Sequence, residues 1–171
     1  MALYIRFLFR FLVILIIQVF IINKLYLTTV LNPNIMVYLV LGLPFNQKPV
    51  NLLAVSFASG LLFDVFLNSP GYCSTAALVV AYTRYFNLKN FSRTEILETN
   101  LTPNTQQMGF LGFLVYAAIH TLIFHLVLAT LQSFTVQLMF ANLLEALVSA
   151  LGTLSIIILA ELLTVKKIQM V

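Results

Sequence analysis

The sequence predicts an all-α integral membrane protein, a compact bundle of about six transmembrane helices. Of its 171 residues, 61% are hydrophobic and only 8% are charged, whereas an ordinary soluble domain carries about 25% charged residues. At about 20 residues for each bilayer-spanning helix, the apolar residues suffice for five or six spans. This composition excludes a disordered chain, a nucleic-acid-binding domain and most soluble enzyme folds.

The apolar runs predict one transmembrane domain over residues 1–171. The expected spans are residues 7–22, 35–45, 50–67, 72–85, 108–131 and 134–165, and residues 86–107 form the main cytoplasmic loop. The second run is the weakest, because Asn32, Pro33 and Asn34 interrupt it. It is either extended at both ends or irregular where other helices shield its backbone. The sixth run would be about 48 Å long as a helix and must tilt, bend or protrude.

The basic residues predict the orientation. With six spans and a cytoplasmic N-terminus, eight of the nine Lys and Arg residues lie inside and only Lys24 lies outside, as the positive-inside rule requires. If the second run does not cross, the best five-span orientation leaves seven inside and two outside. We therefore expect both termini in the cytoplasm. The lone Cys73 has no partner for a disulfide or a thiol metal site.

Small and polar residues at helical spacing predict which helix faces pack, because lipid provides no hydrophobic drive for helices to associate. The third span carries one such stripe, Ser56, Gly60, Asp64 and Asn68. The fourth span carries another, Ser74, Ala77, Ala81 and Arg84. A short turn ending in Gly71 joins them, so the two spans are expected to form a tight antiparallel hairpin whose small faces meet.

The last two spans each have an apolar side and a polar side. In the fifth, an apolar arc faces lipid: Leu111, Val115, Ile119, Leu122 and Leu126. The opposite side carries Gly109, Gly112, Tyr116, Ala117, His120, Thr121 and His125. In the sixth span, the expected inner stripe is Asn142, Glu145, Ser149 and Gly152. This one-sidedness predicts a packed bundle.

Four ionisable groups are expected at membrane depth: Asp64, His120, His125 and Glu145. Each would cost about 2.5 to 3.5 kcal/mol there as a charged group. Asp64 is expected to brace the hairpin near the N-terminal end of the fourth helix, with Ser74 or Thr75 as donor, and an ion-relay role is the alternative.

The sequence leaves the partner of His120, on the fifth helix, open. His120 either pairs with Glu145 across the bundle or is a lone imidazole packed by Tyr116, and a proton pathway through Asp64 is a further alternative. Glu161, close to Lys166, is expected to be interfacial.

Catalytic motifs are missing from the sequence. It has no HExxH, no GxSxG, no Gly-rich phosphate loop and no paired His and Cys spacing. The single Asp excludes a pair of convergent aspartates. We therefore predict a protein that is not an enzyme and that has no catalytic, metal or cofactor site.

The run GLLFDVFLNSPGYCSTAALVVAYTR at residues 60–84 resembles the signature region of the bacterial rod shape-determining MreD family. There, a Gly-x-x-x-Asp motif precedes a short turn ending in Gly and a small-residue helix, and the counterparts here are Gly60, Asp64, Gly71 and residues 74–81. The run TPNTQQMGFLGFLVYAAIHTLIFH at residues 102–125 resembles the fifth-span region of the family.

The resemblance implies a non-enzymatic membrane scaffold of the cell-elongation machinery that builds the peptidoglycan wall. Such a protein lies in the bacterial cytoplasmic membrane and binds the single-span protein MreC. It links the cytoplasmic MreB filament to a glycosyltransferase and transpeptidase pair. The resemblance also implies a bundle similar to the substrate-binding subunits of energy-coupling-factor vitamin transporters, and the hairpin residues would shape that bundle or receive a partner helix.

The competing prediction is a membrane subunit of a transporter that binds a small, vitamin-like molecule. It requires a polar cavity under the outer loops, close to Asp64 and Asn68. The sequence has few convergent polar groups at that position, which favours the scaffold.

Overall fold

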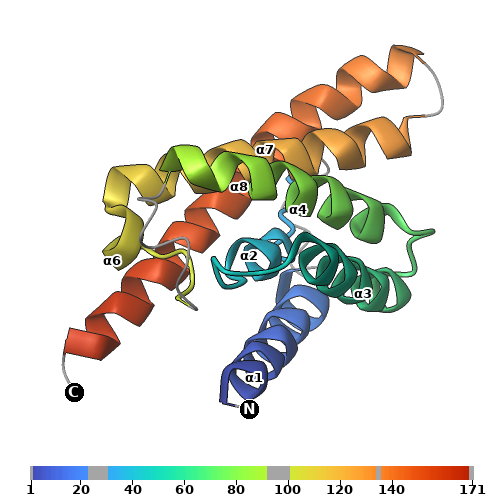
Figure 1. The fold of residues 1–171 in the computed structure, drawn as a ribbon. Coiled ribbons are helices and arrows are strands. Elements are labelled where there is room, and N and C mark those ends of the chain that lie inside the picture. Colours follow the sequence, from blue (N-terminus) through green and yellow to red (C-terminus); the bar gives the residue numbers. More distant parts are fainter. Residues whose placement is uncertain (1, 23–30, 92–100, 134–135, 170–171) are drawn as a thin grey trace.

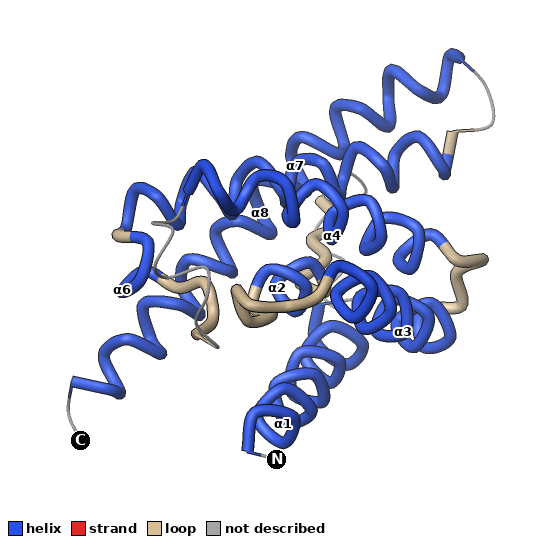
Figure 2. The backbone as a smooth tube through the Cα atoms, viewed as in Figure 1, coloured by secondary structure: helices blue, strands red, loops and turns tan. Residues whose placement is uncertain are grey.

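The computed structural model describes residues 2–22, 31–91, 101–133 and 136–169, and every element within these ranges is a helix (Figures 1 and 2). Three helical stretches are long and apolar enough to cross a membrane: α3 (Pro49–Leu67), α7 (Phe110–Gln132) and Asn142–Leu163 within α8 (Val136–Gln169). The predicted all-α membrane class is confirmed. The count of six spans is not.

The first helix is longer than predicted. α1 covers Ala2–Ile16 and continues as a π-helical turn, η1, over Ile17–Ile21. It begins before residue 7 because residues 2–6 contain no helix-breaking Gly or Pro. The apolar stretch within it, Leu8–Ile21, is shorter than the three candidate spans. Gln18, in the π turn, is buried in the bundle.

Residues 31–45 contain no second spanning helix. Residues 31–34 are irregular, and α2 covers only Val37–Leu41, which is about 8 Å of helix. α2 contacts α1, α4 and α7 (Figure 1), and the side chains around it, from Ile35 to Phe45, are almost all buried. Two interpretations of residues 35–45 were open, an extended helix or irregular backbone shielded by other helices. The structure has the second.

α3 and α4 (Tyr72–Phe91) form the predicted hairpin and pack against each other (Figure 1). α3 begins with Pro49, whose fixed φ suits the first helical position. α4 extends six residues beyond the predicted end at residue 85, because residues 86–91 contain no Gly or Pro. The expected loop at residues 86–107 is therefore partly helical, and Thr105–Met108 forms the short helix α6.

α7 has the two faces that the sequence predicts. Four residues of its apolar arc are exposed: Leu111, Val115, Ile119 and Leu122. On the opposite side, the buried residues include Tyr116, Ala117, His120, Thr121 and His125. This buried side packs against α4 and α8.

α8 is one continuous helix of 34 residues, about 51 Å long, and Figure 1 shows it running beside α7 and then beyond it. Its buried stripe is Ala146, Ser149, Ala150, Thr153, Ile157 and Glu161. The predicted inner stripe is therefore wrong at Glu145, which is exposed. Glu161, which was expected to be interfacial, is only 4% exposed and therefore lies inside the bundle.

Candidate functional site

Gly60 allows α3 and α4 to touch through their backbones. A Cβ atom added at Gly60 would lie 2.4 Å from the Cα of Ser74 and 2.8 Å from its backbone nitrogen. Real Cβ atoms do not approach other atoms so closely, so any larger residue at position 60 must push the helices apart. The predicted meeting of small faces in this hairpin is confirmed.

Asp64 caps the N-terminal end of α4 from the neighbouring helix. Its Oδ1 accepts from the backbone N–H of Cys73 (2.9 Å) and from the Ser69 hydroxyl, and its Oδ2 accepts from the N–H of Ser74 (2.8 Å). The first N–H groups of a helix have no acceptor within the helix, and a carboxylate there also interacts favourably with the helix dipole. Asp64 thus braces the hairpin, and the expected donor Ser74 is confirmed through its backbone N–H, with Cys73 and Ser69 as further donors in place of Thr75.

The other predicted hairpin residues divide into buried and turn positions. Ser56, Ser74, Ala77 and Ala81 are buried at the contact between the helices. Asn68 is instead exposed and does not belong to the packing face, because it ends α3 in the left-handed conformation (φ +52°). Gly71 has a positive φ of +91°, a conformation that glycine adopts more readily than residues with a side chain.

Arg84 is the most unexpected residue of this hairpin, because its side chain is fully buried. Its Nε donates to the hydroxyl of Tyr116 (2.8 Å), and its Nη2 donates to the carbonyls of Leu43 and Pro44. These carbonyls lie in the irregular backbone that follows α2, where buried acceptors need a donor from elsewhere. Arg84 therefore belongs to the core of the bundle and is not one of the charges on its surface.

His120 and Glu145 do not pair. The Nδ1 of His120 donates to the carbonyl of Tyr116 (2.7 Å), and its ring lies 4.7 Å from the Tyr116 ring. Its Nε2 is buried and has no partner among the described residues. Glu145 lies on the exposed side of α8. The structure therefore has the lone imidazole packed by Tyr116.

A small polar cavity of about 50 Å³ lies at the other end of α7, and His125, Asn142 and Glu145 are among the residues that line it. Asn142 donates from its Nδ2 to the hydroxyl of Ser133 (2.9 Å). Within the described ranges, no group of three or more His, Cys, Asp or Glu side chains could hold a metal ion. This cavity therefore brings together three of the predicted intramembrane polar residues without forming a metal site.

Side chains of η1 and α8 satisfy the irregular backbone before α2, residues 32–36, which we call the buried connector. Gln18 donates to the carbonyl of Pro33 and accepts from the N–H of Ile35 (3.1 and 2.9 Å). Ser149 and Thr153 accept from the N–H groups of residues 32 and 34 (2.9 and 3.0 Å). Buried backbone polar groups need such partners, so these contacts are what allow the connector to leave regular helix inside the bundle.

His125 joins this network through Thr153. The Thr153 hydroxyl donates to the carbonyl of Ser149 (2.8 Å) and accepts from the N–H of Asn34. Because its one proton is used, the Nε2 of His125 at 2.9 Å must be the donor. His125 is therefore part of the connector network.

Replacing Thr153 by Val should test this network. The shape of the side chain is kept, but the N–H of Asn34 and the donor of His125 lose their acceptor, so we expect the free energy of unfolding to fall by about 2 kcal/mol. Thermal or denaturant unfolding in detergent measures this. Ser155→Ala is the matched control, because the exposed Ser155 bonds only within its helix and should change stability by less than about 0.5 kcal/mol. Equal stability of the two variants would contradict the role of Thr153.

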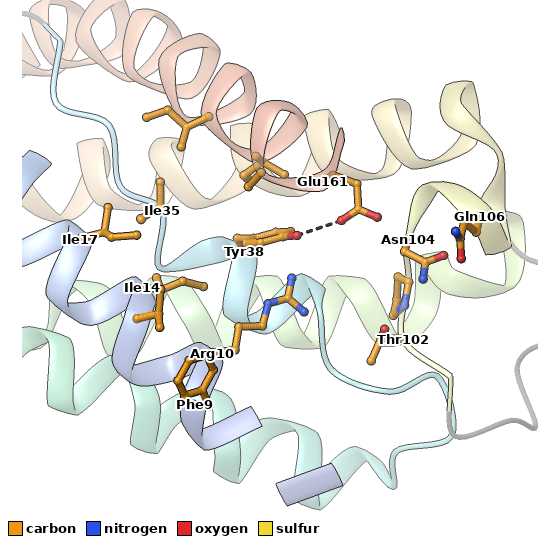
Figure 3. Close-up of a pocket in the computed structure, with 15 residues that line it drawn as sticks. Phe9, Arg10, Ile14, Ile17, Ile35, Tyr38, Thr102, Asn104, Gln106 and Glu161 are labelled. Carbon is orange, nitrogen blue, oxygen red and sulfur yellow. Dashed lines mark hydrogen bonds between the residues drawn. The ribbon is translucent and has the colours of Figure 1, made fainter. Parts of the chain in front are cut away.

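A larger cavity, of about 490 Å³, lies between α1, the start of α2, α8 and residues 102–106. One part has apolar walls, formed by Val13, Ile14, Ile17, Ile35, Ile156 and Ile157. The other end is polar and is formed by Arg10, Tyr38, Thr102, Asn104, Gln106 and Glu161 (Figure 3). We call this the amphipathic cavity.

Two opposite charges are held apart at its polar end. The Arg10 guanidinium lies over the Tyr38 ring, with its Cζ 4.0 Å from the ring centroid. The Tyr38 hydroxyl donates to Oε2 of Glu161 (2.9 Å), and the N–H of Thr105 donates to Oε1 (3.1 Å). Figure 3 shows Tyr38 between the two charged groups.

The sequence did not predict this cavity, because Glu161 was expected at the interface and Arg10 was counted only among the basic residues of the inner side. The i, i+4 series Ser149, Thr153, Ile157 and Glu161 is buried, but the same series includes Glu145, which is exposed, so this spacing alone does not single out Glu161. No spacing links Arg10 with Tyr38 either, because their contact depends on how α1 lies against α2.

The fold and these contacts define the class of protein. It is an all-helical membrane protein, by the length and composition of three of its helices, with polar side chains that satisfy buried backbone and one open amphipathic cavity. No protein-family model matches the chain, and neither the curated proteins nor the solved structures include a significant match to it.

Proposed function

We propose that this protein is a non-enzymatic membrane scaffold of the cell-elongation machinery, of the MreD kind. In this proposal it is a multi-pass protein of the bacterial cytoplasmic membrane with both termini in the cytoplasm. It binds MreC and thereby links the MreB filament to the wall-synthesis glycosyltransferase and transpeptidase.

The observation that carries the proposal is how the signature-like residues are used. Gly60 is in backbone contact with α4, and the Asp64 carboxylate accepts from two N–H groups at the start of α4 and from the hydroxyl of the turn residue Ser69. Residues used in this way shape a rigid hairpin and leave no reactive group facing a cavity. That is the use expected of a scaffold.

The exposed side of α3 offers a surface for a membrane partner. Large apolar side chains cover it: Phe57, Leu61, Leu62, Val65 and Phe66. A single-span partner helix could pack there through van der Waals contacts, as helices do in lipid. The hairpin behind this surface would hold it in a fixed shape.

The transporter alternative receives no comparable support. Neither the amphipathic cavity nor the small polar cavity is lined by Asp64 or Asn68, where that alternative requires a ligand site. It remains a prediction that the test of the scaffold also addresses.

Co-purification tests the scaffold proposal. The full-length protein, expressed with tagged MreC and extracted in mild detergent, should remain bound to it, whereas an unrelated single-span protein with the same tag should not retain it. Depletion in a rod-shaped host should produce round cells. Absence of both the complex and the shape defect would overturn the proposal, and a vitamin that co-purifies instead would favour the transporter.

A further inference from the structure

We propose that the amphipathic cavity binds one phospholipid with a zwitterionic headgroup, in which a phosphate and a primary ammonium group lie close together. The inference does not depend on the proposed function, since a bound lipid could support a scaffold or a transporter. It follows from the size of the cavity, from its polarity and from the charges at one end.

The size and polarity favour an amphiphile. The volume of about 490 Å³ lies within the range of about 300 to 1,000 Å³ typical of small-ligand sites. A partner helix about 10 to 12 Å across would fill this volume with roughly one turn, so the cavity is a poor groove for a helix. The apolar walls suit an acyl chain, and the polar groups gather at one end (Figure 3).

The mouth of the cavity lies beside α1. Phe9 and Val13 line the cavity and are exposed, and both belong to the N-terminal helix that carries the apolar stretch Leu8–Ile21. A lipid chain could therefore enter sideways past α1 from the bilayer. Among the described side chains of α1 that line the cavity, only Arg10 is polar.

The charges at the polar end select the headgroup. Arg10 supplies a planar guanidinium, which recognises phosphate through paired N–H donors. Glu161 supplies a carboxylate with about four acceptor positions, of which Tyr38 and Thr105 use two. Tyr38 lies between Arg10 and Glu161, so each of these charged groups can bind an opposite charge of the ligand. A phosphate would pair with Arg10 and an ammonium group with Glu161. The two side chains together have no net charge, as does a zwitterionic headgroup.

Lipid exchange on the purified protein tests this inference. The detergent-solubilised full-length chain is incubated with phosphatidylethanolamine, phosphatidylcholine or phosphatidylglycerol, and retained lipid is measured by native mass spectrometry together with the thermal midpoint. We expect phosphatidylethanolamine to be retained and to raise the midpoint most. Phosphatidylcholine has the same phosphate but an ammonium without N–H donors, so it should bind more weakly. Preference for phosphatidylglycerol, or no preference, would overturn the headgroup assignment.

Two variants of α8 locate the lipid without changing any charge. Ala160 lines the cavity, whereas Leu159 is exposed and does not line it. Ala160→Phe should occupy the space of the acyl chain and reduce retained phosphatidylethanolamine by about tenfold, because overpacking typically costs about 1 to 3 kcal/mol. Leu159→Phe should retain it as the wild type does. Equal retention by both variants would show that the lipid binds elsewhere.

Two charge variants assign the headgroup contacts. Arg10→Gln should weaken binding of all three lipids by about tenfold, because each carries a phosphate. Glu161→Gln should bring phosphatidylethanolamine down to the level of phosphatidylcholine. If the preference for phosphatidylethanolamine survives Glu161→Gln in a protein that unfolds at the wild-type temperature, the ammonium does not bind Glu161 and the inference fails.

Discussion

Replacing Gly60 by Ala should destabilise the protein more than any other substitution in the hairpin that adds or removes one methyl group. The new Cβ would lie 2.4 Å from the Cα of Ser74, and this atom belongs to backbone that cannot rotate away. Overpacking of this kind costs about 3 kcal/mol, so the free energy of unfolding should fall by about that amount. Unfolding of the purified protein in detergent, followed by circular dichroism, measures the change.

Gly112→Ala provides the matched control, because it makes the same chemical change in another helix. A Cβ at Gly112 would meet only the Cβ of Met108, at 3.6 Å, which is ordinary contact. Alanine favours the helix over glycine by up to about 1 kcal/mol, so this variant should be as stable as the wild type or more stable. If Gly60→Ala were also neutral, the close contact between α3 and α4 would not exist in the folded protein.

Replacing Asp64 by Ala is expected to have the second largest effect. The N–H groups of Cys73 and Ser74 would remain at the buried start of α4 without their acceptor, and the Ser69 hydroxyl would lose its own. Leaving buried donors unsatisfied costs about 1 to 3 kcal/mol, and the lost interaction with the helix dipole adds to it. We expect a total loss of about 3 kcal/mol in the free energy of unfolding.

Two further variants separate bracing from other roles of Asp64. Asp64→Asn keeps one acceptor oxygen and should lose only about half as much stability. Asn51→Ala changes an exposed polar residue of the same helix and should have an effect below about 0.5 kcal/mol. If the proposed scaffold function holds, complete loss of that function in Asp64→Asn at normal stability and protein level would contradict a bracing role and would favour an ion relay.

Local patterns in the sequence predicted the hairpin and the faces of α7. Gly60 and Asp64 lie four residues apart on one helix, so they must share a face whatever surrounds them. The same geometry predicted that Tyr116 and His120 lie together and away from lipid. These predictions needed only the helical repeat and the rule that small and polar residues mark packed faces in membranes.

Other side chains could not be placed from local patterns. Glu145 and Glu161 both lie on α8, yet Glu145 is exposed and Glu161 is buried. The difference arises because Tyr38 and Thr105, distant in sequence, supply the donors that a buried carboxylate needs. A single helix contains no information about those donors.

Composition and helical periodicity are properties of the chain alone, so they were enough to predict the membrane class, the α3–α4 hairpin and the inner face of α7. The three-dimensional fold was needed to show that residues 32–36 form the buried connector before the short helix α2, that Arg84 lies in the core, and that Arg10 and Glu161 line one cavity. Each of these depends on hydrogen-bond partners from distant segments, and a buried polar group is stable only where the fold supplies them.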